Sequence, residues 1–402
     1  MMWEKVAIKD ICTGIYDGPH ATPPLSDTGA IFLGISNFNN GRLDFSDIRY
    51  ISEDDLPKWT KRVVPQKNDI VFSYEATLNL YAIIPEGFRG CLGRRMALLR
   101  VDETKAYYKF LYYYFYSDAW RATVNENIVL GATVDRIPLI KFPNFPVELP
   151  PLETQHRIAD ILSAYDDLIE NNQKQIKLLE EAAQRLYKEW FADLHFPGHE
   201  NTKIVDGVPE GWNWCKLEDA IQFDPKVTLT KERMKQFVPM SALSTSSMVL
   251  DESQFTETTS NSGSKFQNGD TLLARITPCL ENGKTAYVSG LKSNEGAVGS
   301  TEYIVMRAKT INSYMVYLLA RTDDFRQSAI NSMSGSDGRQ RVKSDKLKML
   351  DYLHPTSELV REFGKIAGPI FEKICKLSRQ MEQAKQARDL LLPKLMSGEV
   401  EV

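Results

Sequence analysis

The sequence predicts an α+β protein with two similar mixed α/β domains, each followed by a long helix, and the two helices pair as an antiparallel coiled coil. Three observations predict this architecture. The chain of 402 residues is long enough for two or three domains, its halves repeat one pattern, and an apolar stripe with helical spacing follows each half. We expect a first domain at 1–150, a central helix at 151–195, a second domain at 196–355 and a C-terminal helix at 356–402.

The two halves of the chain match each other in the same order, with an offset of about 200–210 residues. The matches are Trp3, Ile8 and Asp10 with Trp212, Leu217 and Asp219; residues 68–71 with 269–272; Leu99 and Arg100 with Met306 and Arg307; Tyr112, Asp118, Trp120 and Arg121 with Tyr317, Asp323, Phe325 and Arg326; and Pro151 with Pro355. One match alone carries little weight. The shared order favours a duplication over the alternative of two unrelated α/β domains.

Each half contains short apolar runs separated by turn residues and then one helix-like stretch, a pattern typical of a mixed α/β domain. The predicted strands are residues 30–35, 69–73 and 96–101 in the first half and 271–276 and 303–307 in the second, and the predicted helices are residues 107–121 and 313–328. Base stacking is one interpretation of the aromatic run at 107–116. Its helical setting favours core packing instead.

Two apolar stripes alternate spacings of four and three residues, which is the heptad seam of a coiled coil. The stripe positions include Ile158, Leu162, Ile169, Ile176, Leu179 and Leu186 after Pro151, and Ile370, Ile374, Leu377 and Leu391 after Pro355. Asn172 and Arg388 are the polar members, and Gly368-Pro369 is expected to kink or interrupt the second helix near its start. Ordinary core packing in a helical layer is the alternative. Antiparallel pairing would make the coiled coil a spacer between two similar surfaces.

Composition excludes several classes of protein. Hydrophobic residues make up 43% and charged residues 25% of the chain, which is typical of a globular protein. The longest apolar runs have seven residues, at 110–116 and 314–320, so no membrane span is expected. Five scattered cysteines and an N-terminus without an apolar signal core predict a cytoplasmic location.

The net charge of −4 at first argues against a nucleic-acid partner. However, residues 151–195 carry five basic and nine acidic groups, which amounts to a charge of −4 for this segment. The two predicted domains are close to balanced, so the acidity is concentrated in the central helix.

The sequence gives no strong signal for catalysis or for a metal. Residues 283–285 (Gly-Lys-Thr) resemble the end of a phosphate-binding loop, but the first glycine of that loop would fall at Pro278, which has no N–H. His195 and His199 are four residues apart, but Pro197-Gly198 between them prevents a helix, so we expect no metal site.

One enzyme hypothesis remains as an alternative. Asp69, Glu103 and Lys105 have the residue types of a metal-dependent nuclease. The repeat argues against it, because Thr310 takes the place of Glu103 in the second half. We expect no catalytic residue in this chain.

Several longer strings resemble one known family over essentially the full length of the chain. They are residues 17–20, 34–37, 149–159, 208–212, 269–284 and 391–399. The chain is similar to the specificity (S) subunit of type I restriction-modification systems. Residues 149–159 resemble the start of the family's central helix, and 391–399 resemble its C-terminal end.

The resemblance implies a non-catalytic subunit with two target-recognition domains, each recognising one half of a split, asymmetric double-stranded DNA site. The paired helices would set the gap between the half-sites and bind two methyltransferase (modification) subunits. Translocase-nuclease (restriction) subunits would join for cleavage, and no membrane is involved. S-adenosylmethionine, ATP and magnesium would belong to those partners, so we expect no cofactor in this chain.

Side chains on loops beside the strands are the candidates for DNA contact. Arginine and lysine suit guanine, and asparagine suits adenine. The candidates are His20, Tyr74, Arg94 and Arg95 in the first domain and Arg275, Asn282, Lys284, Arg339 and Arg341 in the second. Tyr74 aligns with Arg275, so the domains differ where they would if they recognised different sequences. For each arginine the alternative is an ion-paired role on the surface, and for Tyr74 it is packing in the core. For the whole chain the alternative is a coiled-coil scaffold that recognises no DNA.

Overall fold

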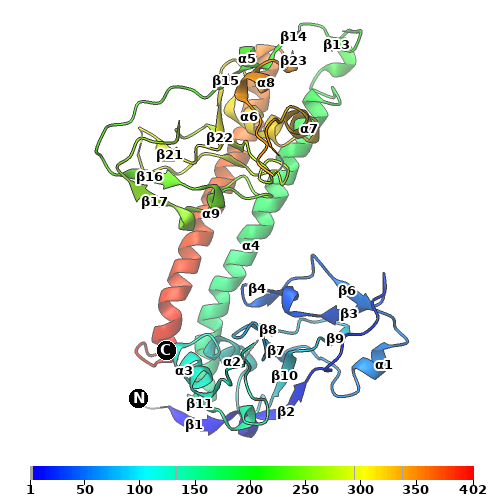
Figure 1. Ribbon diagram of the computed structural model, residues 1–402, viewed down its shortest axis with the longest axis vertical. Coiled ribbons are helices and arrows are strands. Elements are labelled where there is room, and N and C mark those ends of the chain that lie inside the picture. Colours follow the sequence, from blue (N-terminus) through cyan, green and yellow to red (C-terminus); the bar gives the residue numbers. More distant parts are fainter. Residues whose placement is uncertain (1–2, 132–133, 294, 337) are drawn as a thin grey trace. The chain divides into compact units, whose positions relative to one another are not determined.

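The computed structural model describes residues 3–131, 134–293, 295–336 and 338–402, and it divides into two compact units (Figure 1). Unit 1 comprises Met1–Leu168 with Ala384–Val402, and unit 2 comprises Ile169–Gln383. Each unit contains one mixed α/β domain together with part of each long helix, α4 (Leu152–Phe191) and α9 (Ser357–Met396). In the described ranges no helix is long and apolar enough to cross a membrane.

Unit 1 is built around a four-stranded antiparallel sheet. Its strands, in spatial order, are β2 (Cys12–Asp17), β10 (Met96–Val101), β7 (Ile70–Ser73) and β8 (Tyr81–Ile83). A three-stranded sheet contains β6 (Arg49–Ile51), β3 (Ala30–Leu33) and β9 (Gly90–Leu92), and two short sheets pair β1 (Glu4–Ala7) with β11 (Pro146–Leu149) and β4 (Phe38–Asn39) with β5 (Arg42–Leu43). The helices are α1 (Leu56–Trp59), α2 (Tyr108–Tyr114) and α3 (Asp118–Asn127), with short 3-10 turns at Ile8–Ile11, Ile35–Asn37 and Phe142–Asn144.

Unit 2 repeats this plan. Its antiparallel sheet contains, in spatial order, β15 (Ile221–Phe223), β22 (Tyr303–Ala308), β19 (Thr271–Ala274) and β20 (Thr285–Tyr287). A second sheet contains β17 (Thr256–Thr258), β16 (Lys235–Val238), β21 (Ala297–Gly299) and β18 (Ser264–Phe266), and two short sheets pair β14 (Asn213–Lys216) with β23 (Asp351–His354) and β12 (Ile204–Val205) with β13 (Val208–Pro209). The helices are α5 (Leu217–Ala220), α6 (Ser313–Ala320), α7 (Asp323–Asn331) and α8 (Ser344–Lys348), with 3-10 turns at His199–Asn201, Met240–Ala242 and Glu252–Gln254.

A buried ion pair occupies the same place in both four-stranded sheets. In unit 1, Arg100 Nε and Nη2 donate to the two carboxylate oxygens of Asp69 at 2.9 and 2.8 Å. In unit 2, Arg307 makes the same two bonds to Asp270, both at 2.7 Å. These four residues were matched in the sequence repeat, and the identical strand orders confirm that the two domains share a fold.

Two sequence-based expectations about helices are wrong. The predicted helices at 107–121 and 313–328 are each two helices, α2 with α3 and α6 with α7. The breaks arise because Ser117 and Thr322 are N-caps, whose hydroxyls accept hydrogen bonds from Trp120 N and Phe325 N. The aromatic run lies in the core as predicted, with α2 buried from Phe110 to Tyr114.

The second expectation was a kink or an interruption at Gly368-Pro369. The interruption is wrong, because α9 continues through these residues. The helix is stabilised on both sides of Pro369 by buried apolar residues, Phe363 and Ala367 before it and Phe371 and Ile374 after it. A Cβ on Gly368 would stand 3.3 Å from the Tyr314 hydroxyl, so the small residue allows α9 to pack closely on α6. Tertiary packing therefore outweighs the loss of one helical hydrogen bond.

The two long helices pair antiparallel within each unit. In unit 1, Asp166 of α4 accepts from Arg388 of α9 at 2.6 Å, and Ile158 and Leu162 share a core with Leu391. In unit 2, Asn172 donates to the carbonyl of Leu377 at 3.5 Å. The predicted stripe positions Ile169, Ile176, Ile374 and Leu377 are buried, and Leu179, Leu186 and Ile370 are partly buried. The polar members Asn172 and Arg388 are thus each satisfied by the opposite helix.

Within unit 2, a buried carboxylate links α4 to the α/β domain. Glu180 is 7% exposed, and its Oε1 accepts from Met248 N at 2.8 Å and Ser247 Oγ at 3.0 Å. Burial raises the pKa of Glu180, and these two hydrogen bonds and the charge of Arg321 offset the shift only in part. Arg321 is itself anchored to the carbonyls of Thr245 and Gly283, at 3.1 and 2.8 Å.

This geometry makes stability depend on pH in a predictable direction. A raised pKa in the folded state means that folded Glu180 binds its proton more tightly than unfolded Glu180 does. The stability that this protonated group contributes is fully present below the unfolded-state pKa of 4.5 and is lost as the pH rises through the folded-state pKa. We expect Glu180→Gln to raise the free energy of unfolding at pH 7, because a neutral amide oxygen accepts the same two hydrogen bonds. Chemical denaturation at pH 7 and pH 4 checks this: the gain should shrink at pH 4, and an equal gain at both would contradict it.

Candidate nucleic-acid interface

The predicted DNA-contacting residues gather at one end of each four-stranded sheet, which we call the loop end. In unit 1 it is the end where β2 and β7 finish and β10 begins, and Gly18 N donates to Met96 O there at 2.7 Å. In unit 2 it is the end where β15 and β19 finish and β22 begins, and Asp224 N donates to Val305 O at 2.7 Å. The fold thus brings together residues that are far apart in the sequence.

Equivalent backbone contacts relate the two loop ends. Tyr74 N donates to Arg95 O at 3.1 Å, and Arg275 N donates to Glu302 O at 3.0 Å. The carbonyls of Tyr74 and Arg275 accept from Ile137 and Val342 at 2.8 and 2.9 Å. The structure therefore confirms the alignment of Tyr74 with Arg275.

The structure corrects the expectation for Tyr74. Its residue surface is only 7% exposed and its ring packs in the core of unit 1. Burial raises the pKa of Tyr74. The expectation that Tyr74 contacts a base is not supported, because its ring is used for packing, which was the alternative interpretation. At the equivalent position Arg275 is half-buried, and its Nε is buried without a hydrogen-bond partner among the described residues.

Each loop end contains an ion pair of its own. In unit 1, Arg95 Nε lies 3.0 Å from Glu75 Oε1. In unit 2, Arg341 binds Glu302 through Nε and Nη2, with a shortest distance of 2.7 Å. The Arg341 guanidinium lowers the pKa of Glu302. Arg95 lies just before β10 at the position where unit 2 has Glu302 before β22, so the charge differs at this one equivalent position.

The remaining candidates differ in exposure and in whether their side chains are hydrogen-bonded within the domain. Lys284 Nζ donates to Met240 O at 3.0 Å, so part of its hydrogen-bonding capacity holds the domain together. Arg94, Asn282 and Arg339 are exposed. Arg339 lies on a loop closed by the bridge between Ser334 and Arg341. These three have the greatest freedom to reach a ligand.

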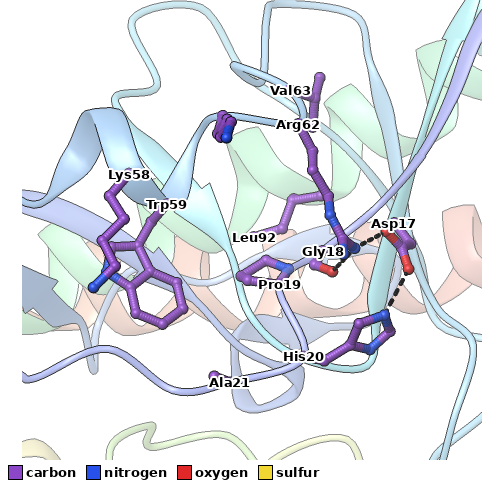
Figure 2. A pocket seen from close by; sticks show the side chains of 11 residues that line it. Asp17, Gly18, Pro19, His20, Ala21, Lys58, Trp59, Arg62, Val63 and Leu92 are labelled. Carbon is purple, nitrogen blue, oxygen red and sulfur yellow. Dashed lines mark hydrogen bonds and ion pairs between the residues drawn. The ribbon is translucent and has the colours of Figure 1, made fainter.

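His20 lines a pocket of about 350 Å³ beside the loop that follows β2 (Figure 2). Its Nε2 lies 3.0 Å from Asp17 Oδ2, and Arg62 pairs with Asp17 from the other side. Arg62 also donates to Gly18 O at 2.9 Å. Figure 2 shows Lys58 beside Trp59 at the far side of the pocket, with the ammonium 5.7 Å from the ring centroid. We call this the unit 1 pocket.

Unit 2 has a pocket of about 650 Å³ beside the loop that follows β15. Its basic lining residues are Lys226, Lys231, Lys265 and Arg275, and its one acidic lining residue is Asp224. Asp224 Oδ1 accepts from Val305 N at 3.1 Å, so this carboxylate is used within the fold. We call this the unit 2 pocket.

The sequence analysis missed most of these cations. Only His20 and Arg275 were among its candidates, whereas Lys58, Lys61 and Arg62 also line the unit 1 pocket. The string Lys-Trp-Thr-Lys-Arg at 58–62 is a basic cluster with an aromatic residue inside it, and it was a usable signal. The cations of unit 2 are dispersed from Lys226 to Arg275, and the sequence alone does not bring them together.

The residues of the nuclease hypothesis have structural partners instead. Asp69 is 2% exposed and holds Arg100. Glu103 accepts from Asn68 Nδ2 at 3.3 Å, and Lys105 donates to Asp10 O at 3.1 Å. Asp69 is therefore committed to a buried ion pair and does not present its carboxylate to a metal ion.

Comparison with known proteins gives a consistent result. Residues 2–181 match the family model described as type I restriction modification DNA specificity domain. The type I restriction enzyme MjaIX specificity subunit of Methanocaldococcus jannaschii is 25% identical over 364 residues, which cover 88% of this chain and 82% of that protein. The type I restriction enzyme EcoAI specificity subunit of Escherichia coli is 34% identical over 140 residues, which cover 34% of this chain and 24% of that protein.

A solved structure supports the same comparison at the level of the fold. The crystal structure of the type I restriction-modification system S subunit from M. genitalium superposes with a TM-score of 0.62 at 16% sequence identity. The match covers 98% of this chain and 96% of that one. The shared fold therefore extends into the second half of the chain, beyond the residues that the family model matches.

Proposed function

Because this chain is a homologue of the specificity subunits of type I restriction-modification systems, and its residues 2–181 belong to the family of type I restriction modification DNA specificity domains, we propose that it is the subunit that recognises DNA sequence in such a complex. Its two domains each recognise one half of a split, asymmetric double-stranded site. The chain is non-catalytic, and adenine methylation and restriction are carried out by its partners.

One observation carries this proposal furthest: the two domains share a fold but differ at the equivalent positions of their loop ends. Tyr74 stands where unit 2 has Arg275, and Arg95 stands where unit 2 has Glu302, so each of these two residues pairs with a different partner, Arg95 with Glu75 and Glu302 with Arg341. A duplicated scaffold with different side chains at its loops suits the recognition of two different base sequences, since bases are distinguished by the side chains that reach them.

The partners follow from the same proposal. The paired helices α4 and α9 bind two methyltransferase subunits, and translocase-nuclease subunits join for restriction. S-adenosylmethionine, ATP and magnesium serve the chemistry of those partners, and this chain contributes no cofactor site. The protein acts in the cytoplasm, where the DNA and its partners are found.

DNA binding at different salt concentrations tests the function. We expect the full chain alone to bind duplex DNA weakly and with steep salt dependence, because phosphate contacts dominate affinity. Binding should tighten when the methyltransferase subunit encoded beside it is added. Fluorescence anisotropy with labelled duplexes measures both. A chain that binds its partner but gives no DNA binding in the complex would contradict the proposal and favour the coiled-coil scaffold.

A further inference from the structure

The pockets of the two units lie at equivalent places in the repeated fold. The first wall of each is the loop after the first strand of the four-stranded sheet, β2 in unit 1 and β15 in unit 2. The second wall is the segment that leads into the third strand, at residues 58–63 before β7 and 261–265 before β19. Since Asp69 and Asp270 are equivalent, these two segments occupy matching stretches of the repeat.

Both pockets are basic although the chain as a whole carries a charge of −4. The unit 1 pocket has Lys58, Lys61 and Arg62 beside a single acidic residue, Asp17. The unit 2 pocket has four cations beside Asp224 alone. In each pocket the carboxylate is already engaged, Asp17 by Arg62 and His20 and Asp224 by the Val305 N–H.

The cations do not come from the same positions in the two pockets. In unit 1 all three lie on the second wall, at Lys58, Lys61 and Arg62. In unit 2 Lys226 and Lys231 lie on the first wall, and Lys265 lies on the second wall. If the basic residues were only left over from the duplication, they would occupy equivalent positions in the two domains. The same net sign reached from different positions indicates that both pockets are used to bind an anion.

The lysines are suited to phosphate. Lys58, Lys61, Lys226 and Lys231 are exposed, and in the part of the chain that the structure describes none of them pairs with a carboxylate. A lysine ammonium is a flexible point charge without the planar fork that arginine offers to a guanine edge. Lysines that lack a carboxylate partner therefore favour contact with a backbone phosphate over recognition of a base.

We propose that the unit 1 pocket and the unit 2 pocket each bind a backbone phosphate of the DNA, and so set the position of each domain on its half-site. This inference rests on the proposed function and assigns a docking role to lysines that were not among the residues predicted from the sequence to contact DNA. The neighbouring exposed side chains Arg94 and Arg339 are then left to contact bases. Phosphate contacts position a protein on the duplex, whereas base contacts specify the sequence.

Two charge-removing double variants test the proposal, Lys58→Gln with Lys61→Gln and Lys226→Gln with Lys231→Gln. The controls Lys9→Gln and Lys346→Gln each remove one exposed lysine of the same unit outside the pockets, so losses are compared per charge removed. Each is made in the full chain, assembled with the methyltransferase subunit, and titrated against the recognised duplex and a random duplex at several salt concentrations. Unchanged thermal melting confirms that the variants fold.

We expect each double variant to lower the affinity for both duplexes by the same factor. The slope of log affinity against log salt concentration should fall in magnitude by about 0.9 per lost phosphate contact. The methylated motif should stay the same. A slope unchanged from the wild type would overturn the proposal, and so would a loss confined to the recognised duplex or an altered motif, which would indicate base contact. In each of those cases the wild-type complex still methylates its motif, so the proposed function survives; a wild-type complex that neither binds nor methylates DNA would overturn both.

Discussion

Arg307→Ala should lower the free energy of unfolding of the chain by about 3–5 kcal/mol, the cost of leaving one partner of a buried ion pair alone. Its partner Asp270 is 1% exposed and accepts two hydrogen bonds from Arg307, both at 2.7 Å. The other bond to this carboxylate comes from Gln267 N at 2.8 Å, which does not supply the missing charge. Denaturant unfolding monitored by tryptophan fluorescence measures the loss.

The equivalent change in unit 1, Arg100→Ala, should have a similar effect because Asp69 is buried in the same way. Arg89→Ala is the matched control, since the Arg89–Glu53 pair is exposed on both sides and exposed pairs contribute little. Equal losses at Arg307 and Arg89 would contradict the structural role given to the buried pairs. A double replacement of Arg307 and Asp270 by apolar residues should recover much of the loss.

Arg339→Ala should relax the recognised DNA sequence in one half of the site and leave the other half unchanged. A well-placed arginine contact to a guanine is worth about 1–3 kcal/mol of discrimination against the wrong base. Arg339 is exposed and lies on a loop at the loop end of unit 2, so its side chain is available for such a contact. Arg94→Ala, at the loop end of unit 1, should relax the opposite half.

These two variants serve as controls for each other. Mapping of N6-methyladenine in a methylation-free bacterial host, with the chain and its methyltransferase subunit expressed together, reports both halves of the motif at once. Relaxation of both halves by one variant would contradict the assignment of one half-site to each domain. An unchanged motif in both variants would show that Arg94 and Arg339 contact no base.

Much of the fold could be predicted because the decisive residues are buried. Asp69 with Arg100 and Asp270 with Arg307 hold equivalent strands together, so a duplicated fold has to keep them, and their recurrence revealed the repeat. The heptad stripes of α4 and α9 could be recognised in the sequence because their residues are buried or partly buried. The errors had two origins. The caps at Ser117 and Thr322 are local hydrogen bonds whose sequence signal was overlooked. The packing of α9 around Pro369 depends on tertiary contacts.

The candidate interface could be predicted only in part. The candidates were placed on loops beside strands, and the fold gathers those loops at one end of each sheet. Burial could not be inferred for Tyr74, nor the commitment of Arg341 to Glu302 and of Lys284 to Met240, because each depends on a residue distant in the sequence. The basic pockets were missed because their walls meet only in the folded domain.

Recognition of a split DNA site by the two domains of this chain is the central claim, and methylation mapping tests it most directly. The chain and the methyltransferase subunit encoded beside it would be expressed in a methylation-free host, and N6-methyladenine would be located by single-molecule sequencing. We predict a two-part motif with an unread gap that is absent when this chain is omitted. No new methylation, although the two proteins co-purify, would contradict the claim.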